Sequence, residues 1–374
     1  MSILLMDDFR AYPTAEEMLA DGGKGGPWTT FDKVLNAGFS LVSNPTWRGD
    51  ASTIRALNNN LGSDRRAPQR DFSASAVKSV CAQFICGTTG GSEVQTESCN
   101  FTLFQDPVTD KDLANSNQLS SFYGISIRAA STSVGATGQV GVYYTILTGT
   151  NGVSNQALIG YLRPWTRDRH YHVELKVDHT NPLARIIVYV NGVLELDATY
   201  DRDRVDSGLQ TKDFKRVLLG GVAYMSTQTR YPKYSNLVIY TDEPGTVFPM
   251  GPIDLVTVNP TAGQSYDGLR AAPNADDTTY ATVLPGATLN GTFEDLAAGN
   301  PVLAVDATIR HGSVAGLEPS QITTRIRKAD NTVVGTIVTT AAPGVPPTHR
   351  RLRLPADMTV ADVNGATFQI QAAG

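Results

Sequence analysis

Two carboxylates, Glu195 and Asp197, have a spacing that could serve the hydrolysis of a sugar polymer. A glycoside hydrolase places two carboxyl groups roughly 5–9 Å apart across the bond that it breaks, one as an acid and the other as a base or nucleophile. Side chains two positions apart on a β-strand face the same side, so one strand can carry such a pair. The same residues are also ordinary on a solvated strand face, and we favour this second interpretation.

Three histidines that could bind a metal ion lie close together in the sequence. His170 and His172 fall on one strand face, and His179 follows them. Imidazole nitrogen is a good ligand for several transition metals. No carboxylate converges on these histidines in the sequence, so we favour solvent-facing histidines over a metal site.

The three cysteines, Cys81, Cys86 and Cys99, are odd in number. They allow one disulfide with a free thiol, or three reduced thiols. We expect reduced thiols, because proteins made in the cytoplasm rarely keep disulfides. A zinc site would need a fourth ligand, which the neighbouring sequence does not offer.

Aromatic side chains could stack on sugars, although most aromatic residues of β-sandwiches belong to the core, where we expect these to lie. The candidates are Trp28, Trp47, Trp165, Tyr143 and Tyr144.

Arginines at alternating positions near the C-terminus could form a docking surface for an acidic neighbouring subunit. A merely solvated sheet face is the other interpretation, and it is the one we favour. The residues of this predicted docking surface are Arg325, Arg327, Arg350, Arg351 and Arg353.

Composition limits the class of protein. The chain of 374 residues is 41% hydrophobic and 18% charged, so it can bury a sizeable core. Its net charge of −5 does not provide the basic surface of a nucleic-acid binder. No apolar run approaches the roughly 18 residues of a membrane helix, and the start is too short and too acidic for a secretory signal. We therefore expect synthesis in the cytoplasm and no membrane insertion.

Alternating hydrophobicity predicts β-strands along most of the chain. In the stretch Tyr171–Val177 the odd-numbered residues should face a core, whereas His172, Glu174 and Lys176 should face solvent. Asn191-Gly192 should form a tight turn between two further strands, Ala184–Val190 and Val193–Leu196.

Other segments carry weaker strand patterns, and one short helix is expected at Thr14–Ala20, capped by Thr14. The remaining predicted strands are 37–42, 79–85, 101–104, 122–128, 138–147, 158–162, 216–224, 235–240, 302–310, 321–328, 332–339, 350–354 and 367–372.

Prolines at 249, 252 and 260 interrupt the alternation and indicate a connector between two domains. We expect a first domain at 1–247, a Pro-rich connector at 248–262 and a second domain at 263–374.

Several of these segments resemble a known family. Tyr171–Val177 followed by Ile187–Val193 resembles the strand and "hYvNGxxh" hairpin of concanavalin A-like/laminin-G-like domains, and Lys233–Tyr240 resembles their last strand. Ile3–Tyr12 is similar to the "lhMDgFDhY" start of a group of tailed-bacteriophage virion proteins. Ala272–Tyr280 resembles the "PDgDtsYv" element that follows the lectin-like domain in phage tail-associated proteins.

The resemblance implies an all-β protein made of two tandem β-sandwich domains, a concanavalin/laminin-G-like jelly roll and a smaller jelly-roll-like sandwich. In retaining hydrolases of this fold the carboxylates follow Glu-x-Asp-x-Glu or Glu-x-Asp-x-x-Glu. Here Thr199 or Tyr200 stands where the second glutamate belongs, so we expect no enzyme. Domains of this kind often hold a structural calcium ion, for which Asp106, Asp110 and Asp178 are candidates; no other cofactor is expected.

The expected function is that of a virion structural protein, made in the host cytoplasm and assembled into the phage particle. A tail-associated position is favoured over a capsid decoration or cement protein. A depolymerase acting on bacterial polysaccharide is the alternative from another class. The expected partners are other virion proteins, further copies of the same chain and a glycan of the host surface.

Overall fold

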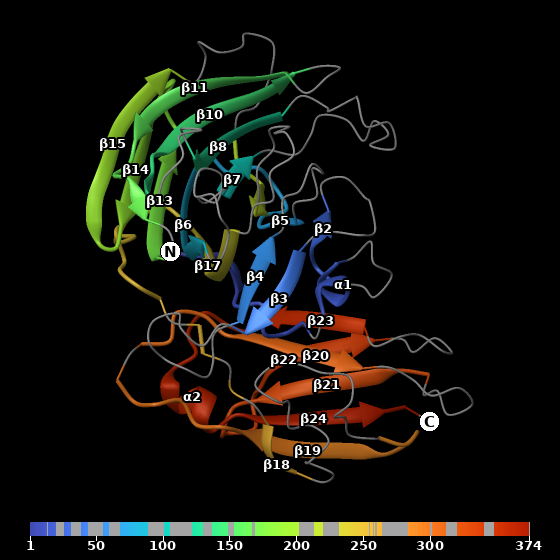
Figure 1. The fold of residues 1–374 in the computed structure, drawn as a ribbon. Coiled ribbons are helices and arrows are strands. Elements are labelled where there is room, and N and C mark those ends of the chain that lie inside the picture. The colour runs from blue at the N-terminus through green and yellow to red at the C-terminus, as the bar shows by residue number, and fades with distance from the viewer. Residues whose placement is uncertain are drawn as a thin grey trace. The chain divides into compact units, whose positions relative to one another are not determined.

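The computed structural model (Figure 1) describes residues 1–12, 14–19, 26–30, 39–43, 55–59, 68–88, 101–104, 122–129, 137–148, 153–166, 169–201, 213–219, 232–253, 255–256, 258, 260–263, 283–299, 301–311, 320–339 and 348–373. Within these ranges the protein is all-β, as predicted, with only two short helices, α1 (Ala15–Met18) and α2 (Val360–Asn364). Neither helix is long and apolar enough to cross a lipid bilayer.

The chain divides into two compact units. The first comprises Met1–Phe9 and Trp28–Leu255, and the second comprises Arg10–Pro27 and Val256–Gly374. The boundary between the two units falls inside the expected connector, 248–262. Its first half belongs to the first unit and its second half to the second unit. Helix α1, which the sequence predicted, belongs to the second unit and is capped by a hydrogen bond from the Glu17 backbone N–H to the Thr14 hydroxyl.

The first unit contains an eight-stranded antiparallel sheet in the order β15-β14-β13-β6-β17-β4-β3, with β1 paired to β17. Its strands are β1 (Ile3–Asp7), β3 (Phe39–Ser43), β4 (Arg55–Asn59), β6 (Ser79–Thr88), β13 (His170–Asp178), β14 (Leu183–Val190), β15 (Val193–Asp201) and β17 (Pro232–Thr241).

A seven-stranded sheet in the order β11-β10-β8-β7-β16-β5-β2 belongs to the same unit. Its strands are β2 (Thr29–Thr30), β5 (Pro68–Asp71), β7 (Phe101–Phe104), β8 (Phe122–Ala129), β10 (Val140–Thr148), β11 (Val153–Tyr161) and β16 (Arg216–Leu219), and a separate pair joins β9 (Thr137–Gly138) to β12 (Trp165–Thr166).

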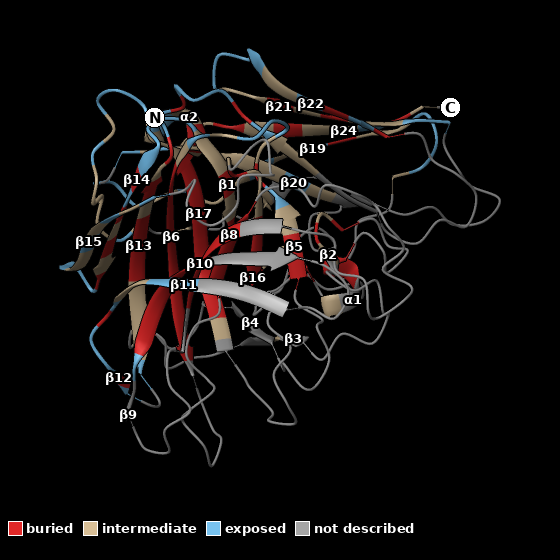
Figure 2. Ribbon diagram, turned by 90° about the horizontal axis from the view of Figure 1, so that it is seen from above, coloured by how far each residue is buried: buried red, intermediate tan, exposed pale blue. Residues whose placement is uncertain are grey.

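The two large sheets pack face to face as a sandwich. Phe84 of β6 stacks on Phe101 of β7 with ring centroids 4.1 Å apart, and Figure 2 shows β6 and β17 buried along most of their length. The sheets also meet along one edge, where Gly160 of β11 lies so close to Leu196 of β15 that an added Cβ would stand 2.6 Å from a leucine methyl carbon.

The N-terminal strand is anchored by a buried carboxylate. Asp7 is 3% exposed and accepts hydrogen bonds from the indole N–H of Trp28 at 3.0 Å and from Nη1 of Arg70 at 2.9 Å. Arg70 lies on the seven-stranded sheet and Asp7 on the eight-stranded sheet, so this ion pair links the two layers. A buried charge keeps its place only when it is paired in this way.

The predicted meander is present at β13, β14 and β15. Val173, Leu175 and Val177 are fully buried, as the alternation predicts. Asn191 and Gly192 form the turn with φ angles of 51° and 77°, which is the left-handed backbone that this dipeptide favours.

The second unit pairs a five-stranded sheet in the order β18-β19-β24-β21-β22 with a two-stranded sheet, β20-β23. The strands are β18 (Pro260–Gly263), β19 (Thr288–Phe293), β20 (Asp306–His311), β21 (Ile322–Arg327), β22 (Val333–Thr339), β23 (Thr348–Arg353) and β24 (Thr367–Ala372).

A second, smaller core lies between these two sheets. Ile326 of β21 and Leu354, which follows β23, belong to one buried cluster with Met358 and Val363. Gly335 of β22 faces this core, because a Cβ added there would lie 2.6 Å from methyl carbons of Leu352 and Leu354. Alternation then sends the odd-numbered residues of β21 and β24 to the opposite, outer face of the five-stranded sheet.

Candidate functional site

A buried carboxylate, Glu174 of β13, lies on the outer face of the eight-stranded sheet. The sequence predicted that this side chain faces solvent, and that prediction is wrong, because Glu174 is 0% exposed. Residues 248–253 and 255, which we call the strap, cover this side chain, and no local pattern in the sequence indicated this. Glu174 Oε2 accepts hydrogen bonds from the backbone N–H groups of Met250 at 2.7 Å and Gly251 at 3.1 Å.

Gln83 of β6, paired in register with Glu174, holds the next part of the strap. Its amide nitrogen donates to the Gly251 carbonyl, and its amide oxygen accepts from the Ile253 N–H at 2.8 Å. Apolar residues complete the attachment: the strap side chains Phe248, Met250, Ile253 and Leu255 pack against the buried cluster Cys81, Val238 and Tyr240. The strap therefore covers this sheet face with a small core of its own.

The protonation of Glu174 is affected by this environment. Burial raises the pKa of the Glu174 carboxyl, because the charged form loses its hydration, and the hydrogen bonds from Met250 and Gly251 act in the opposite direction. His172 lies nearby, with Nδ1 3.9 Å from Glu174 Oε1. Glu174 is 0% exposed and its Oε2 binds two backbone N–H groups of the strap, so we assign this residue a structural role.

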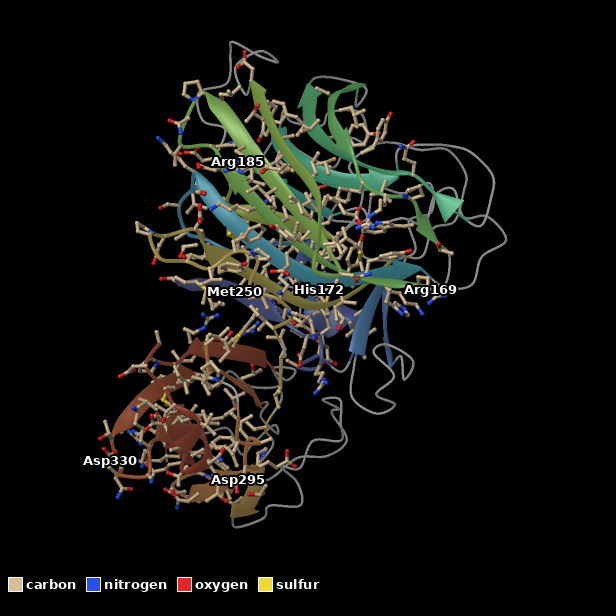
Figure 3. All side chains as sticks on the ribbon, turned by 90° about the vertical axis from the view of Figure 1, so that its left-hand side faces the viewer. Arg169, His172, Arg185, Met250, Asp295 and Asp330 are labelled. Atoms are coloured by element: carbon tan, nitrogen blue, oxygen red, sulfur yellow. The ribbon has the colours of Figure 1, made fainter. Side chains whose placement is uncertain are left out.

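The carboxylates singled out by the sequence are engaged in ion pairs. Glu195 accepts from the backbone N–H of Arg163 at 2.8 Å and from its Nε at 3.1 Å. Asp197 pairs with Arg185, and that guanidinium lowers the pKa of the Asp197 carboxyl. Figure 3 shows Arg185 well away from His172 within this unit. The Asp197 side chain is 39% exposed, which fits the solvated-face interpretation, whereas the Glu195 side chain is only 5% exposed, so that interpretation is wrong for Glu195.

The three histidines do not form a metal site. His179 is 0% exposed and lies against the rings of Tyr200 and Phe214, whereas His172 faces Glu174. In the described part of the chain no three His, Cys, Asp or Glu side chains come together as metal ligands. Asp178, a calcium candidate, accepts from the Thr180 N–H at 2.8 Å within its own turn. The other candidates, Asp106 and Asp110, lie outside the described residues.

Cys81 and Cys86 are buried free thiols, and burial raises the pKa of the Cys81 thiol to about 12. Cys81 is therefore protonated and unreactive at neutral pH. Cys99 lies outside the described residues.

The aromatic candidates that the structure describes are buried, as expected. Trp165 is 6% exposed and stacks on Tyr171 with ring centroids 4.5 Å apart, and Tyr143 and Tyr144 are 9% and 1% exposed. Trp28 is held by Asp7, and Trp47 lies outside the described residues.

The outer face of the seven-stranded sheet carries a polar row. Thr102 and Ser126 are paired in register and share a hydrogen bond of 2.9 Å between their hydroxyl groups, with Tyr143 next in the row. These side chains and the neighbouring Gln69 are all less than a tenth exposed. A polar row that is buried cannot serve as an open contact surface, so we do not assign binding to it.

The predicted arginine docking surface divides between two opposite faces of the second unit. Arg325 and Arg327 lie on the outer face of the five-stranded sheet, whereas Arg351 and Arg353 lie on the outer face of β20-β23. Strand β23 also carries Arg350, whose side chain lies outside the described residues. The five arginines therefore cannot form one surface.

The two arginine pairs also differ in charge compensation. Arg351 and Arg353 both form ion pairs with Asp306, whose side chain is 7% exposed; Arg351 Nε lies 2.7 Å from it. Arg325 instead donates Nη1 to the amide oxygens of Gln369 at 3.3 Å and Gln371 at 3.1 Å. Arg327 donates Nη1 to the Asn331 carbonyl at 3.1 Å. Among the described residues, no carboxylate pairs with Arg325 or Arg327.

These two arginines belong to a regular array that we call the polar grid. Strand register places twelve outer-face side chains in three rows across β19, β24, β21 and β22. The rows are Thr288-Gln371-Thr323-Val338, Asn290-Gln369-Arg325-Thr336 and Thr292-Thr367-Arg327-Val333.

The polar grid is open to solvent and carries positive charge. Asn290, Thr292, Thr336 and Gln371 are among its exposed members. It contains no acidic and no aromatic residue, and a Gln369–Asn290 amide hydrogen bond of 3.2 Å ties two of its strands together. Amide, hydroxyl and guanidinium groups can donate and accept hydrogen bonds, but they cannot perform acid–base catalysis at neutral pH.

The sequence had indicated only the arginines of this site. The amide and hydroxyl residues were not recognised, because β19 (Thr288–Phe293) is too polar to be read as a strand. Their alternation with Leu289, Phe368 and Ile326 was the available signal.

Comparison with known proteins adds distant fold similarities. The sequence matches no protein-family model and no curated protein sequence. Among solved structures, the carbohydrate-binding module CBM66 from Bacillus subtilis is 14% identical, with 57% of this chain and 96% of that one covered at a TM-score of 0.31.

Two enzyme structures are comparably distant. The catalytic domain of a glycoside hydrolase family 131 protein from Coprinopsis cinerea is 11% identical, covering 67% of this chain and 98% of its own at a TM-score of 0.38. The alginate lyase vAL-1 from Chlorella virus is 9% identical, covering 64% and 100% at a TM-score of 0.33. At such distances, what those proteins bind or cleave does not transfer to this chain.

Proposed function

We propose that this chain is a non-enzymatic structural protein of a tailed-bacteriophage particle, associated with the tail, and that the polar grid is its contact surface for the host. The proposal takes its context from the resemblance of Ile3–Tyr12 and Ala272–Tyr280 to phage virion proteins. The observation that carries the contact surface is the grid itself, which is open and holds two arginines that have no carboxylate partner among the residues that the structure describes.

The state of the carboxylates supports the non-enzymatic part of the proposal. Glu195 and Asp197 are paired with arginines, and Glu174 holds the strap. Asp7 and Asp306 are buried under ion pairs in the same way. A hydrolase needs two carboxyl groups that reach one bond, and each of these five already holds a structural partner.

The position in the particle is tested by immunogold electron microscopy of purified phage, with antibody raised against this chain. We expect label at the tail. A lattice of label over the head would replace the tail assignment with a capsid decoration protein, and the absence of label from intact and from opened particles would contradict the virion assignment.

A depolymerase would have to release new sugar ends. We expect no increase in reducing ends when the purified chain is incubated with host surface polysaccharide. A steady increase, abolished by replacing a single carboxylate, would make the chain an enzyme.

A further inference from the structure

We infer that the polar grid binds a polysaccharide that carries carboxylate groups, with Arg325 and Arg327 as the carboxylate ligands. The inference rests on the proposed function only in taking this face as the adhesive one. Each step below comes from the charge, the hydrogen bonds or the residue types of the grid.

The charge of the grid indicates the sign of the charge on its ligand. Two of the twelve grid positions are arginines and none is acidic, so these described positions together carry a net positive charge. The contrast with Arg351 and Arg353 is informative, because both of these pair with Asp306 on the other outer face, and its carboxylate offsets one of their two charges. A positive surface without internal compensation attracts an anionic ligand.

Hydrogen bonds within the second unit hold the guanidinium groups of Arg325 and Arg327 in place before any ligand binds. Gln369 and Gln371 hold its Nη1 at 3.3 and 3.1 Å, and the Asn331 carbonyl holds Nη1 of Arg327 at 3.1 Å. Each guanidinium has five N–H donors, and the described partners use only Nη1. The remaining donors form the planar fork that binds a carboxylate through two parallel hydrogen bonds.

The other grid residues fit sugar hydroxyl groups better than a protein partner. Tight protein interfaces depend on buried aromatic and large apolar anchors, and the only apolar grid residues are Val333 and Val338 on the edge strand β22. Amides and hydroxyls both donate and accept, as sugar hydroxyls do. The grid also lacks an aromatic ring on which a neutral sugar would stack, so the arginines are its main source of affinity.

The regular spacing favours a polymer over a single sugar. Neighbouring strands stand about 4.8 Å apart, and alternate residues on one strand about 7 Å apart. The grid therefore repeats the same kinds of donor and acceptor in two directions across a flat sheet face. A chain of repeating sugars can satisfy several rows at once, and this raises affinity through multivalent contact.

The test uses the full chain in isothermal titration calorimetry with three probes: polygalacturonate, neutral dextran and poly-L-glutamate. We expect binding to polygalacturonate, no binding to dextran and weaker binding to poly-L-glutamate. The double variant R325Q/R327Q should weaken polygalacturonate binding by at least about tenfold, because it removes both guanidinium groups that would form charged hydrogen bonds with the carboxylates. Circular dichroism should confirm that the variant is folded.

The matched control is R163Q/R185Q, which removes two exposed positive charges from the first unit. It should bind polygalacturonate like the unchanged chain. An equal loss in both double variants would show charge attraction without a site and overturn the inference. A third variant, Q369A/Q371A, keeps the charge and removes the hold on Arg325, so it should weaken binding severalfold.

Two further outcomes separate this inference from the proposed function. Tighter binding of poly-L-glutamate than of polygalacturonate would replace the polysaccharide with an acidic protein surface. No binding to any probe, together with immunogold label at the tail, would overturn the ligand and leave the virion assignment standing.

Discussion

The outer face of the eight-stranded sheet and the outer face of the five-stranded sheet are both formed by strands with alternating side chains. The first face is covered by another chain segment, whereas the second is open to solvent. In the first unit, Val238 and Tyr240 make the outer face apolar, and the strap covers it. In the second unit, the outer face has Thr, Gln, Asn and Arg at almost every position and stays open. An apolar outer face must be covered to be stable in water, whereas a polar one is stable while it remains available to a partner.

The largest expected effect on the free energy of unfolding distinguishes the two faces of strand β24. Phe368 of β24 is 5% exposed and lies 5.2 Å from the ring of Phe293, while Gln369 points to the polar grid. We expect Phe368→Ala to lower the free energy of unfolding of the second unit by about 3–4 kcal/mol, and Gln369→Ala by under about 0.5 kcal/mol. Hydrogen exchange of the β21 and β24 amides during urea unfolding measures both. Equal losses would mean that the grid residues are structural.

The covered face depends on its carboxylate. Glu174→Ala leaves the N–H groups of Met250 and Gly251 without their acceptor, and we expect a loss of about 2–3 kcal/mol in the first unit. Faster hydrogen exchange at Met250, Gly251 and Ile253 would show release of the strap. Glu243→Ala is the control, because Glu243 is exposed and binds only the chain terminus and nearby hydroxyls. Unchanged exchange in Glu174→Ala would mean that the apolar contacts alone hold the strap.

The two arginine pairs should respond differently to loss of charge. Asp306→Asn removes the negative charge between Arg351 and Arg353 and should destabilise the second unit by about 1–2 kcal/mol. Arg325→Gln should change stability by under about 0.5 kcal/mol, because no described carboxylate depends on that arginine. Thermal unfolding followed by calorimetry compares them. A larger loss in Arg325→Gln would contradict the separation into a compensated and an uncompensated pair.

The smallest effect concerns pH. Because burial raises the pKa of Glu174, the folded state binds its proton more tightly than the unfolded state does. Stability contributed by this group is therefore present below the unfolded pKa of about 4.3 and falls as pH rises through the folded pKa. Glu174→Gln carries no titrating proton, so the stability of the unchanged chain minus that of the variant should fall with rising pH above this value. A difference that rises with pH would reverse the assigned direction.

Particular residues show how far the sequence could be interpreted. Asn191-Gly192 fixed the position of the hairpin, and the alternation of Val173, Leu175 and Val177 gave the correct core face. Strand β19 was missed because Thr288, Asn290 and Thr292 lower its hydrophobicity, and β5 was missed because it is short and begins with proline. Both lie inside sheets whose other strands supply the pairing.

The candidate site was predicted only in part. The sequence named Arg325 and Arg327 only as members of a docking surface for a neighbouring subunit, together with Arg350, Arg351 and Arg353, because these arginines stand at alternating positions. Sequence spacing shows that two residues share a face of their own strand. It does not show which outer face of a sandwich that strand presents.

What the sequence by itself determined was local: the strands with strong alternation, the tight turn and the all-β class. These depend on the backbone geometry of adjacent residues, which residue types report directly. Only the tertiary structure decided that Glu174 is buried, that residues 248–253 and 255 form a strap, and that no described carboxylate pairs with the grid arginines. Burial and charge compensation depend on contacts between residues such as Gln83 and Ile253, which are distant in sequence, and no local pattern encodes which segment will cover which face.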